Sequence, residues 1–245
     1  MRLKLISCEV LFREMCAVVA RSPHQIDIEF LPKGLHDLAG ARMRDRIQER
    51  IDATDASRYE AILLGYALCG NGSLGIAARG IPVVLPRAHD CIALLLGSRT
   101  RYQEYFDAHS GVYFQSPGWL ERGVDLDQSR LESNRLRTGA GLTLDELIAR
   151  HGEENGRYVY DQLTAYQHTY RELTYIETGV EPDGSFEQRA RAEAAARGWQ
   201  FQRVRGSLTL FERLVNGDWD QADFLTVPPG AVVQRRFDAD IVGTA

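Results

Sequence analysis

The sequence predicts an α/β protein built of two Rossmann-like lobes, each with a parallel sheet, and a cleft between the lobes. Short apolar segments alternate along the chain with amphipathic segments of helical period, an order typical of doubly wound sheets. Residues 60–66 and 81–85 are apolar without alternation, which indicates interior strands covered on both faces. The pattern therefore favours helices on both sides of a mainly parallel sheet.

The first lobe is expected at residues 1–110, where a strand followed by a helix occurs four times. The expected strands are residues 3–8, 26–31, 60–66 and 81–85. The expected helices are residues 12–20, 39–53, 73–78 and 92–108. The third of these helices is short and follows a Gly-Asn-Gly turn. The common strand order 2-1-3-4 would make strands one, three and four neighbours.

The second lobe is expected at residues 111–245, where the strands are less apolar. The expected strands are residues 112–115, 173–176, 199–205 and 224–227. The expected helices are residues 144–170 (broken near 152–156), 186–197 and 208–216. Thr143 and Glu146 fit a capping box at the start of one helix, and Gly198 stops another.

Composition limits the classes of function. The 245 residues carry a formal net charge of -5, which argues against nucleic acid as a partner because phosphate binding requires a basic face. No apolar segment is long enough to span a bilayer, and the first residues lack the apolar core of a signal peptide. Four cysteines in a chain of this length do not form a disulfide framework. We therefore expect a cytoplasmic protein with reduced thiols and no membrane partner.

Cysteine and histidine occur where three of the expected strands end. These residues are Cys8, Cys69, His89 and Cys91. The carboxyl ends of neighbouring parallel strands open into one crevice, so the four side chains are expected to meet there. Thiolate and imidazole are ligands that zinc prefers, and the sequence therefore predicts a zinc site. Three protein ligands would leave a catalytic position open, whereas four would close a structural site.

A free cysteine is also among the most buried residue types, so each of these thiols can instead be a packing residue. Cys16 lies inside the first helical pattern and is assigned to the core. Cys69 and Cys91 are better ligand candidates, because each lies beside residues that do not build cores.

Further polar and aromatic residues are expected around the same crevice. Arg87 can clamp an anion, and Glu177, at the end of a second-lobe strand, can act as a general acid or base. Both are expected to act in catalysis. Contact with the substrate is expected from Tyr66, Gly70, Asn71, Ser98, Tyr102, Trp119 and His36. For Gly70 the alternative is a tight turn that requires a positive φ, and for Arg87 it is a surface ion pair.

Five segments carry a resemblance to a known family. They are residues 31–37 (LPKGLHD), 66–72 (YALCGNG), 86–91 (PRAHDC), 95–102 (LLGSRTRY) and 111–119 (GVYFQSPGW). The chain resembles, over nearly its whole length, the uncharacterised prokaryotic proteins catalogued as domain of unknown function 1638. The resemblance implies no established activity. It implies a soluble protein that often accompanies corrinoid-dependent methyl-transfer systems.

The His89-x-Cys91 step with a distant cysteine is also similar to the zinc site of methylcobamide:thiol methyltransferases. That likeness implies a zinc ion that deprotonates a substrate thiol into a nucleophile. Two features depart from it: Cys69 precedes the His89-x-Cys91 step, and the chain is too short for that family's barrel.

The resulting hypothesis is a zinc-thiolate enzyme of one-carbon metabolism that transfers a methyl group between a thiol or corrinoid and a small acceptor. Its partners would be a small-molecule substrate and a corrinoid protein or methyltransferase. The alternative is a non-catalytic accessory protein that binds a corrinoid or metal for a methyltransferase system. A structural zinc site remote from the activity is a further alternative. A two-lobed racemase is disfavoured, because it needs one cysteine from each lobe and all four cysteines precede residue 110.

Overall fold

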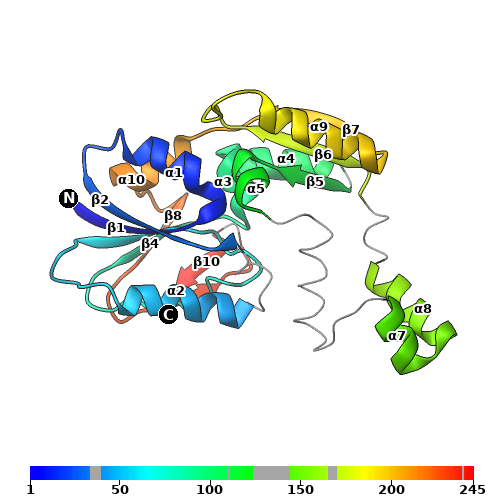
Figure 1. Ribbon diagram of the computed structural model, residues 1–245. Coiled ribbons are helices and arrows are strands. Elements are labelled where there is room, and N and C mark those ends of the chain that lie inside the picture. Colours follow the sequence, from blue (N-terminus) through cyan, green and yellow to red (C-terminus); the bar gives the residue numbers. More distant parts are fainter. Residues whose placement is uncertain (34–39, 110, 124–143, 165–169, 239) are drawn as a thin grey trace.

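The computed structural model describes residues 1–33, 40–109, 111–123, 144–164, 170–238 and 240–245. It confirms the predicted α/β class with two sheets in which parallel pairing predominates (Figure 1). None of the helices in these ranges is long and apolar enough to cross a membrane.

The first sheet has the strand order β2-β1-β3-β4-β8. Its members are β1 (Arg2–Cys8), β2 (Gln25–Leu31), β3 (Ala61–Gly65), β4 (Val83–Pro86) and β8 (Phe224–Val227). The first four strands are parallel in the expected order 2-1-3-4, whereas β8 is antiparallel to β4. The carboxyl ends of β1, β3 and β4 therefore lie along one edge of the sheet.

Helices cover both faces of the first sheet (Figure 1). On one face, α1 (Phe12–Val19) and α10 (Thr209–Asn216) bury Met15 and Phe211 in the same core as Leu5. On the other face, α2 (Gly40–Asp52) packs Ile47 against strand residues. Successive residues of a strand point to opposite faces, so the apolar segments of the interior strands supply both cores.

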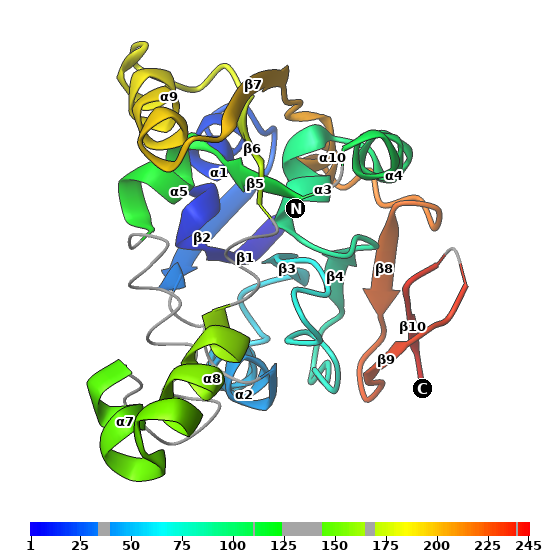
Figure 2. The same cartoon turned by 90° about the vertical axis from the view of Figure 1, so that its right-hand side faces the viewer.

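The second sheet consists of β5 (Val112–Gln115), β6 (Glu172–Glu177) and β7 (Gln200–Arg205), all parallel. One face packs on α9 (Ser185–Arg197) through Tyr175 and Ala190. Phe114 joins instead the core that contains α3 (Cys91–Leu96). Figure 2 shows α3 and α4 (Arg99–Ala108) between the second sheet and β8.

The C-terminal part of the chain returns to the first sheet. Residues 111–245 are expected in a second lobe, yet β8 pairs with β4 and α10 packs with α1. A hairpin of β9 (Val233–Arg235) and β10 (Val242–Thr244) follows β8. An apolar strand segment does not encode its pairing partner, so the local pattern could not show this return.

The expected helix at residues 73–78 is wrong, because these residues form turns and an isolated bridge. The backbone around them has positive φ angles at Cys69 (46°), Gly70 (63°), Asn71 (75°) and Gly75 (80°). A right-handed helix requires negative φ throughout, so the glycine-rich turn excludes it.

The single helix expected at residues 92–108 is also wrong. Gly97 adopts a left-handed conformation and ends α3, and the Ser98 side chain then caps α4 by accepting the Arg101 N–H. The break expected near residue 152 is confirmed, since Gly152 has a φ of 77° between α7 (Leu144–His151) and α8 (Glu153–Thr164). Thr143 lies outside the described residues.

Two short helices without a prediction lie beside the carboxyl edge of β1. They are the 3-10 helix η1 (Glu9–Leu11) and α5 (Pro117–Arg122). A Cβ added to Gly118 would lie 1.6 Å from the Val10 carbonyl oxygen, so only glycine allows this approach. Their contact brings Trp119 toward the end of β1.

Candidate thiol site at the carboxyl edge of the first sheet

Cys8, Cys69 and Cys91 come together at the carboxyl edge of the first sheet. Cys8 is the last residue of β1, Cys69 follows β3, and Cys91 begins α3. The charged forms of these side chains interact: Cys8 raises the pKa of Cys69, and both raise the pKa of Cys91. The strand order β1-β3-β4 is the reason for this meeting.

The backbone fixes Cys69 beside the segment that carries His89. The Cys69 N–H donates to the His89 carbonyl at 2.9 Å, and the Leu68 N–H donates to Ala88 at 2.9 Å. Cys69 and Asn71 have positive φ angles, which non-glycine residues rarely adopt. Strain of this kind costs on the order of 1–3 kcal/mol per residue and gathers at functional sites.

Each of the three sulfurs receives an N–H hydrogen bond. The donors are the Val10 backbone for Cys8, the Ala67 and Cys91 backbones for Cys69, and the Trp119 side chain for Cys91. These bonds lower the thiol pKa, but burial is the larger effect and raises it. The pKa values of Cys8 and Cys69 reach about 12, and that of Cys91 is also well above its usual value. The three groups are therefore protonated at neutral pH.

A lysine that the sequence analysis missed lies against the same cluster. Lys33 is only 4% exposed, and its Nζ lies 4.7 Å from the centroid of the Trp119 ring. Its positive charge lowers the pKa of Cys8. The Glu9 carboxylate accepts the Lys33 N–H at 2.7 Å and so holds this segment. The available signal was its position, two residues after β2 ends at the same edge.

Two aromatic residues that were predicted to contact the substrate, Tyr66 and Trp119, lie beside the three cysteines. Tyr66 is buried, and burial raises its pKa, with smaller contributions from Cys8 and Cys69. Trp119 contacts both cores of the first sheet and donates to Cys91.

The side chain of His89, which was predicted as a metal ligand, lies at the surface. It is exposed and lines a pocket together with Tyr102 and Gln103. The carboxylate of Asp90, the next residue, caps α3 by accepting the Ile92 and Ala93 N–H groups. It also accepts a hydrogen bond from the Tyr102 hydroxyl at 2.8 Å. Within the described ranges, no three His, Cys, Asp or Glu side chains are arranged to hold a metal ion as they stand.

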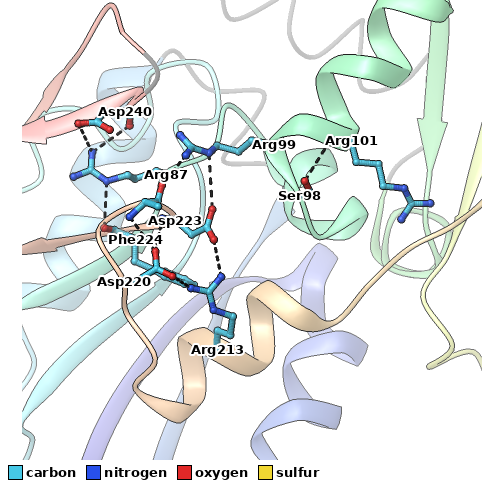
Figure 3. A network of polar contacts seen from close by, with 10 residues as sticks. Arg87, Ser98, Arg99, Arg101, Arg213, Asp220, Asp223, Phe224 and Asp240 are labelled. Atoms are coloured by element: carbon cyan, nitrogen blue, oxygen red, sulfur yellow. Dashed lines mark hydrogen bonds and ion pairs between the residues drawn. The ribbon is translucent and has the colours of Figure 1, made fainter.

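Arg87 and Glu177 occupy other environments. Figure 3 shows Arg87 among C-terminal residues, where its buried guanidinium donates to the carbonyls of Phe224 and Asp240 at 3.2 Å and also to that of Val242. Glu177, at the end of β6, is partly exposed and lies 3.8 Å from Arg203. Arg87 therefore anchors the C-terminal hairpin, and Glu177 belongs to the second sheet.

The remaining expected contact residues are dispersed. Gly70 and Asn71 form the turn after Cys69, and the Asn71 side chain accepts a hydrogen bond from Arg235. Ser98 caps α4, and Tyr102 holds Asp90. His36 lies outside the described residues.

The fold and the three cysteines place the chain among the doubly wound α/β proteins, with Cys8, Cys69 and Cys91 at the switch point between parallel strands. The particular family follows from a match over residues 30–215, and the chain belongs to the family described as "Protein of unknown function (DUF1638)". The matched region includes Cys69, His89 and Cys91 and begins after Cys8. No curated protein and no solved structure matches the chain.

Proposed function

We propose that this protein binds a soft cation, zinc, through the thiolates of Cys8, Cys69 and Cys91. The observation that carries the proposal is the meeting of three thiols, each with an N–H donor directed at its sulfur. Such donors stabilise sulfur in its negatively charged form, which is the form that ligates a metal. Packing cysteines do not require them.

The charges around the cluster support the same proposal. Zinc with three thiolates carries a formal charge of about -1, because two positive charges meet three negative ones. A buried charge requires a counter-charge nearby, and Lys33 is a buried cation whose field reaches Cys8. Binding must draw the sulfurs into a coordination shell, which cysteine achieves by changing its χ1 rotamer.

Three protein ligands leave one position of tetrahedral zinc for a substrate. We propose that a zinc ion held by Cys8, Cys69 and Cys91 would lower the pKa of a substrate thiol, so that solvent takes its proton. The thiolate would then accept the methyl group of a methylated corrinoid to give a thioether, and the electron pair of the broken cobalt–carbon bond would remain with the corrinoid. The proposed reaction requires a corrinoid as partner, which the family resemblance also implies.

A second candidate, a non-catalytic metal- or corrinoid-binding accessory protein, is favoured by the burial of Cys8 and Cys91. Cys8 is 2% and Cys91 7% exposed, and neither lines the pocket beside His89. A metal that is held at these thiols for a partner protein does not have to be reached by a substrate. An enzyme would have to open this buried site to admit its substrate.

Zinc content measured by mass spectrometry on tag-free protein purified anaerobically tests the proposal. We expect about one zinc per chain in the wild type and loss of zinc in a Cys91→Ser variant that keeps its far-ultraviolet circular dichroism. The matched control is Cys16→Ser, the same change in a cysteine of α1 outside the cluster. His89→Ala should also keep its zinc.

A methyl-transfer assay with methylcobalamin and a panel of small thiols separates the two candidates. Loss of the methyl–cobalt absorbance with the wild type, and not with Cys91→Ser, would support the enzyme. Zinc without turnover would favour the accessory protein. If freshly purified protein contains no zinc and also takes up none on titration, the metal site is overturned. Zinc that is lost only when the protein unfolds would indicate a structural ion.

A further inference from the structure

The turn that follows Cys69 is held in a conformation that two of its residues do not favour. Cys69 and Asn71 have φ angles of 46° and 75°, in the left-handed region that residues with a side chain rarely adopt. Gly70, between them, has a φ of 63° without this cost. Non-glycine residues keep such angles only where the surrounding structure holds them in place. The contacts of this turn with the rest of the chain therefore decide where Cys69 lies.

Some of these contacts come from the C-terminal hairpin. Arg235, the last residue of β9, donates from its guanidinium to the side-chain oxygen of Asn71. The backbone of β9 binds the same turn further along. The Gly75 N–H donates to the Val233 carbonyl at 2.9 Å, and the Val233 N–H donates to the Ile76 carbonyl at 2.8 Å. The hairpin thus holds this turn at two places.

The side chain of Arg235 has a different set of contacts from that of its neighbour. Its guanidinium carbon lies 5.7 Å from the centroid of the Phe237 ring, a cation–π contact that explains why an aromatic side chain 93% exposed is found here. Arg236 pairs instead with Asp238, at 3.0 Å. Arg235 therefore reaches from the hairpin to the turn, whereas Arg236 binds within the hairpin.

The same part of the chain also binds the segment that carries Cys91. Arg87, four residues before Cys91, donates to the Asp240 carbonyl at 3.2 Å, just before β10 (Figure 3). The Cys69 N–H donates to the His89 carbonyl at 2.9 Å, so the two cysteine-bearing segments also bind each other. The C-terminal hairpin and the residues that lead into β10 thus contact both segments whose thiols meet.

We propose that Arg235 is a positioning residue of the thiol site, which holds Asn71 and thereby fixes the Cys69 sulfur beside the other two thiols. This inference rests on the proposed metal binding, because a metal requires the sulfur at one defined place. A tetrahedral zinc site tolerates little displacement of a ligand. Release of the turn should therefore weaken metal binding while the protein stays folded.

Labelling of the metal-free protein with N-ethylmaleimide tests the positioning role without any metal. Peptide mass spectrometry gives the labelling rate of each cysteine separately. In Arg235→Ala we expect Cys69 to react roughly three- to tenfold faster than in the wild type, the factor that corresponds to the loss of one hydrogen bond. Cys8, within β1, should keep its rate, and the melting temperature should not change. The matched control is Arg236→Ala, which should label like the wild type.

A double-mutant cycle shows whether Arg235 acts through Asn71. Asn71→Gly removes the acceptor and allows the positive φ, so Arg235→Ala added to it should have no further effect on Cys69. Arg235→Lys retains a donor and should restore most of the wild-type rate. The affinity for Co(II), followed by the thiolate-to-cobalt charge-transfer absorbance, should fall by a similar factor in Arg235→Ala and recover in Arg235→Lys.

Unchanged labelling of Cys69 in Arg235→Ala would overturn the positioning role, whether or not the protein binds a metal. An equal rise at Cys8 and Cys91 would also overturn it, because the whole site would then be loosened. Additive effects in the cycle would overturn the route through Asn71. Faster labelling of Cys69 alone, together with no metal uptake by the wild type, would support the Arg235 contact and overturn the proposed metal site.

Discussion

Glu14 is a carboxyl group closed off inside the core between the two sheets. It is fully buried on α1, and its Oε1 accepts the Thr178 hydroxyl at 2.8 Å from just beyond the end of β6. Its Oε2 has no hydrogen-bond partner in the described part of the chain. Its pKa is raised to about 7, mainly by burial, with a smaller contribution from the nearby Glu181.

This pKa predicts how stability changes with pH. The folded state retains the Glu14 proton up to about pH 7, whereas in the unfolded chain the group titrates near its ordinary value of 4.5. The free energy of unfolding should therefore fall as pH rises from 4.5 through 7, by roughly 2–3 kcal/mol in total. Urea unfolding of the wild type and Glu14→Gln at pH 5 and pH 8 measures the difference.

Glu14→Gln should lose most of this fall, because its amide does not titrate. Glu104→Gln, at an exposed position of α4, should keep the wild-type dependence. An equal fall in the wild type and Glu14→Gln would assign the pH dependence to other groups.

At the scale of elements, the contact of η1 with α5 decides where Trp119 lies. The Ser116 hydroxyl caps α5 by accepting the Trp119 N–H, and Gly118 lets the helix meet the Val10 carbonyl. The Val10 backbone also donates to Cys8. The close contact of Val10 with Gly118 therefore positions both this donor and Trp119 beside the three cysteines.

Gly118→Ala should displace α5 and destabilise the protein. The added Cβ would lie 1.6 Å from the Val10 oxygen, a backbone atom that no side-chain rotation can move away. We expect a loss of about 1–3 kcal/mol or more in the free energy of unfolding, with altered Trp fluorescence. Chemical denaturation followed by fluorescence measures both.

Gly184→Ala is the matched control, because the nearest atom to its added Cβ is the end of the Gln188 side chain at 3.8 Å. Its stability should stay within about 0.5 kcal/mol of the wild type. A Gly118→Ala protein as stable as this control would contradict the close approach.

At the scale of the whole molecule, the C-terminal segment completes the first sheet by adding a strand at its edge. β8 adds an antiparallel strand to β4, and the Arg87 guanidinium binds carbonyls from Phe224, Asp240 and Val242. Arg87 thus joins β4 to a segment more than 130 residues away in sequence. The family match ends at residue 215, before this closure begins.

Arg87→Lys should weaken that closure. A lysine ammonium lacks the planar fork that reaches several carbonyls at once, so buried acceptors lose their donor. We expect a loss of about 2–4 kcal/mol in stability and faster hydrogen exchange of β9 and β10. Hydrogen–deuterium exchange with mass spectrometry reports both regions.

Arg46→Lys, on the exposed face of α2, should leave exchange unchanged. If Arg87→Lys kept wild-type stability and exchange in β9 and β10, Arg87 would not be the anchor of the hairpin, and its expected role at a substrate would regain support.

The hydrophobic pattern of the sequence identified nearly all strands and most helices. Burial on both faces and helical periodicity can be recognised from consecutive residues, without knowledge of the rest of the chain. It failed where backbone dihedrals override apolar content. Gly70, Asn71 and Gly75 turn the chain where a helix is expected, and Gly97 divides α3 from α4. It also placed residues 224–227 in the second lobe, whereas β8 pairs with β4 in the first sheet.

From local sequence, the α/β class could be predicted, and the strand order 2-1-3-4 that is common in such sheets is confirmed. That order placed Cys8, Cys69, His89 and Cys91 near the carboxyl ends of neighbouring strands as a prediction. Strand order follows from general rules of parallel sheets, so residues at strand ends are predictable. The tertiary structure was needed to show that Lys33 lies near Cys8, that His89 lines a pocket and that Arg87 donates to the C-terminal hairpin. The positions of these three side chains depend on the direction of each side chain and on contacts between segments far apart in sequence. A local sequence pattern contains neither kind of information.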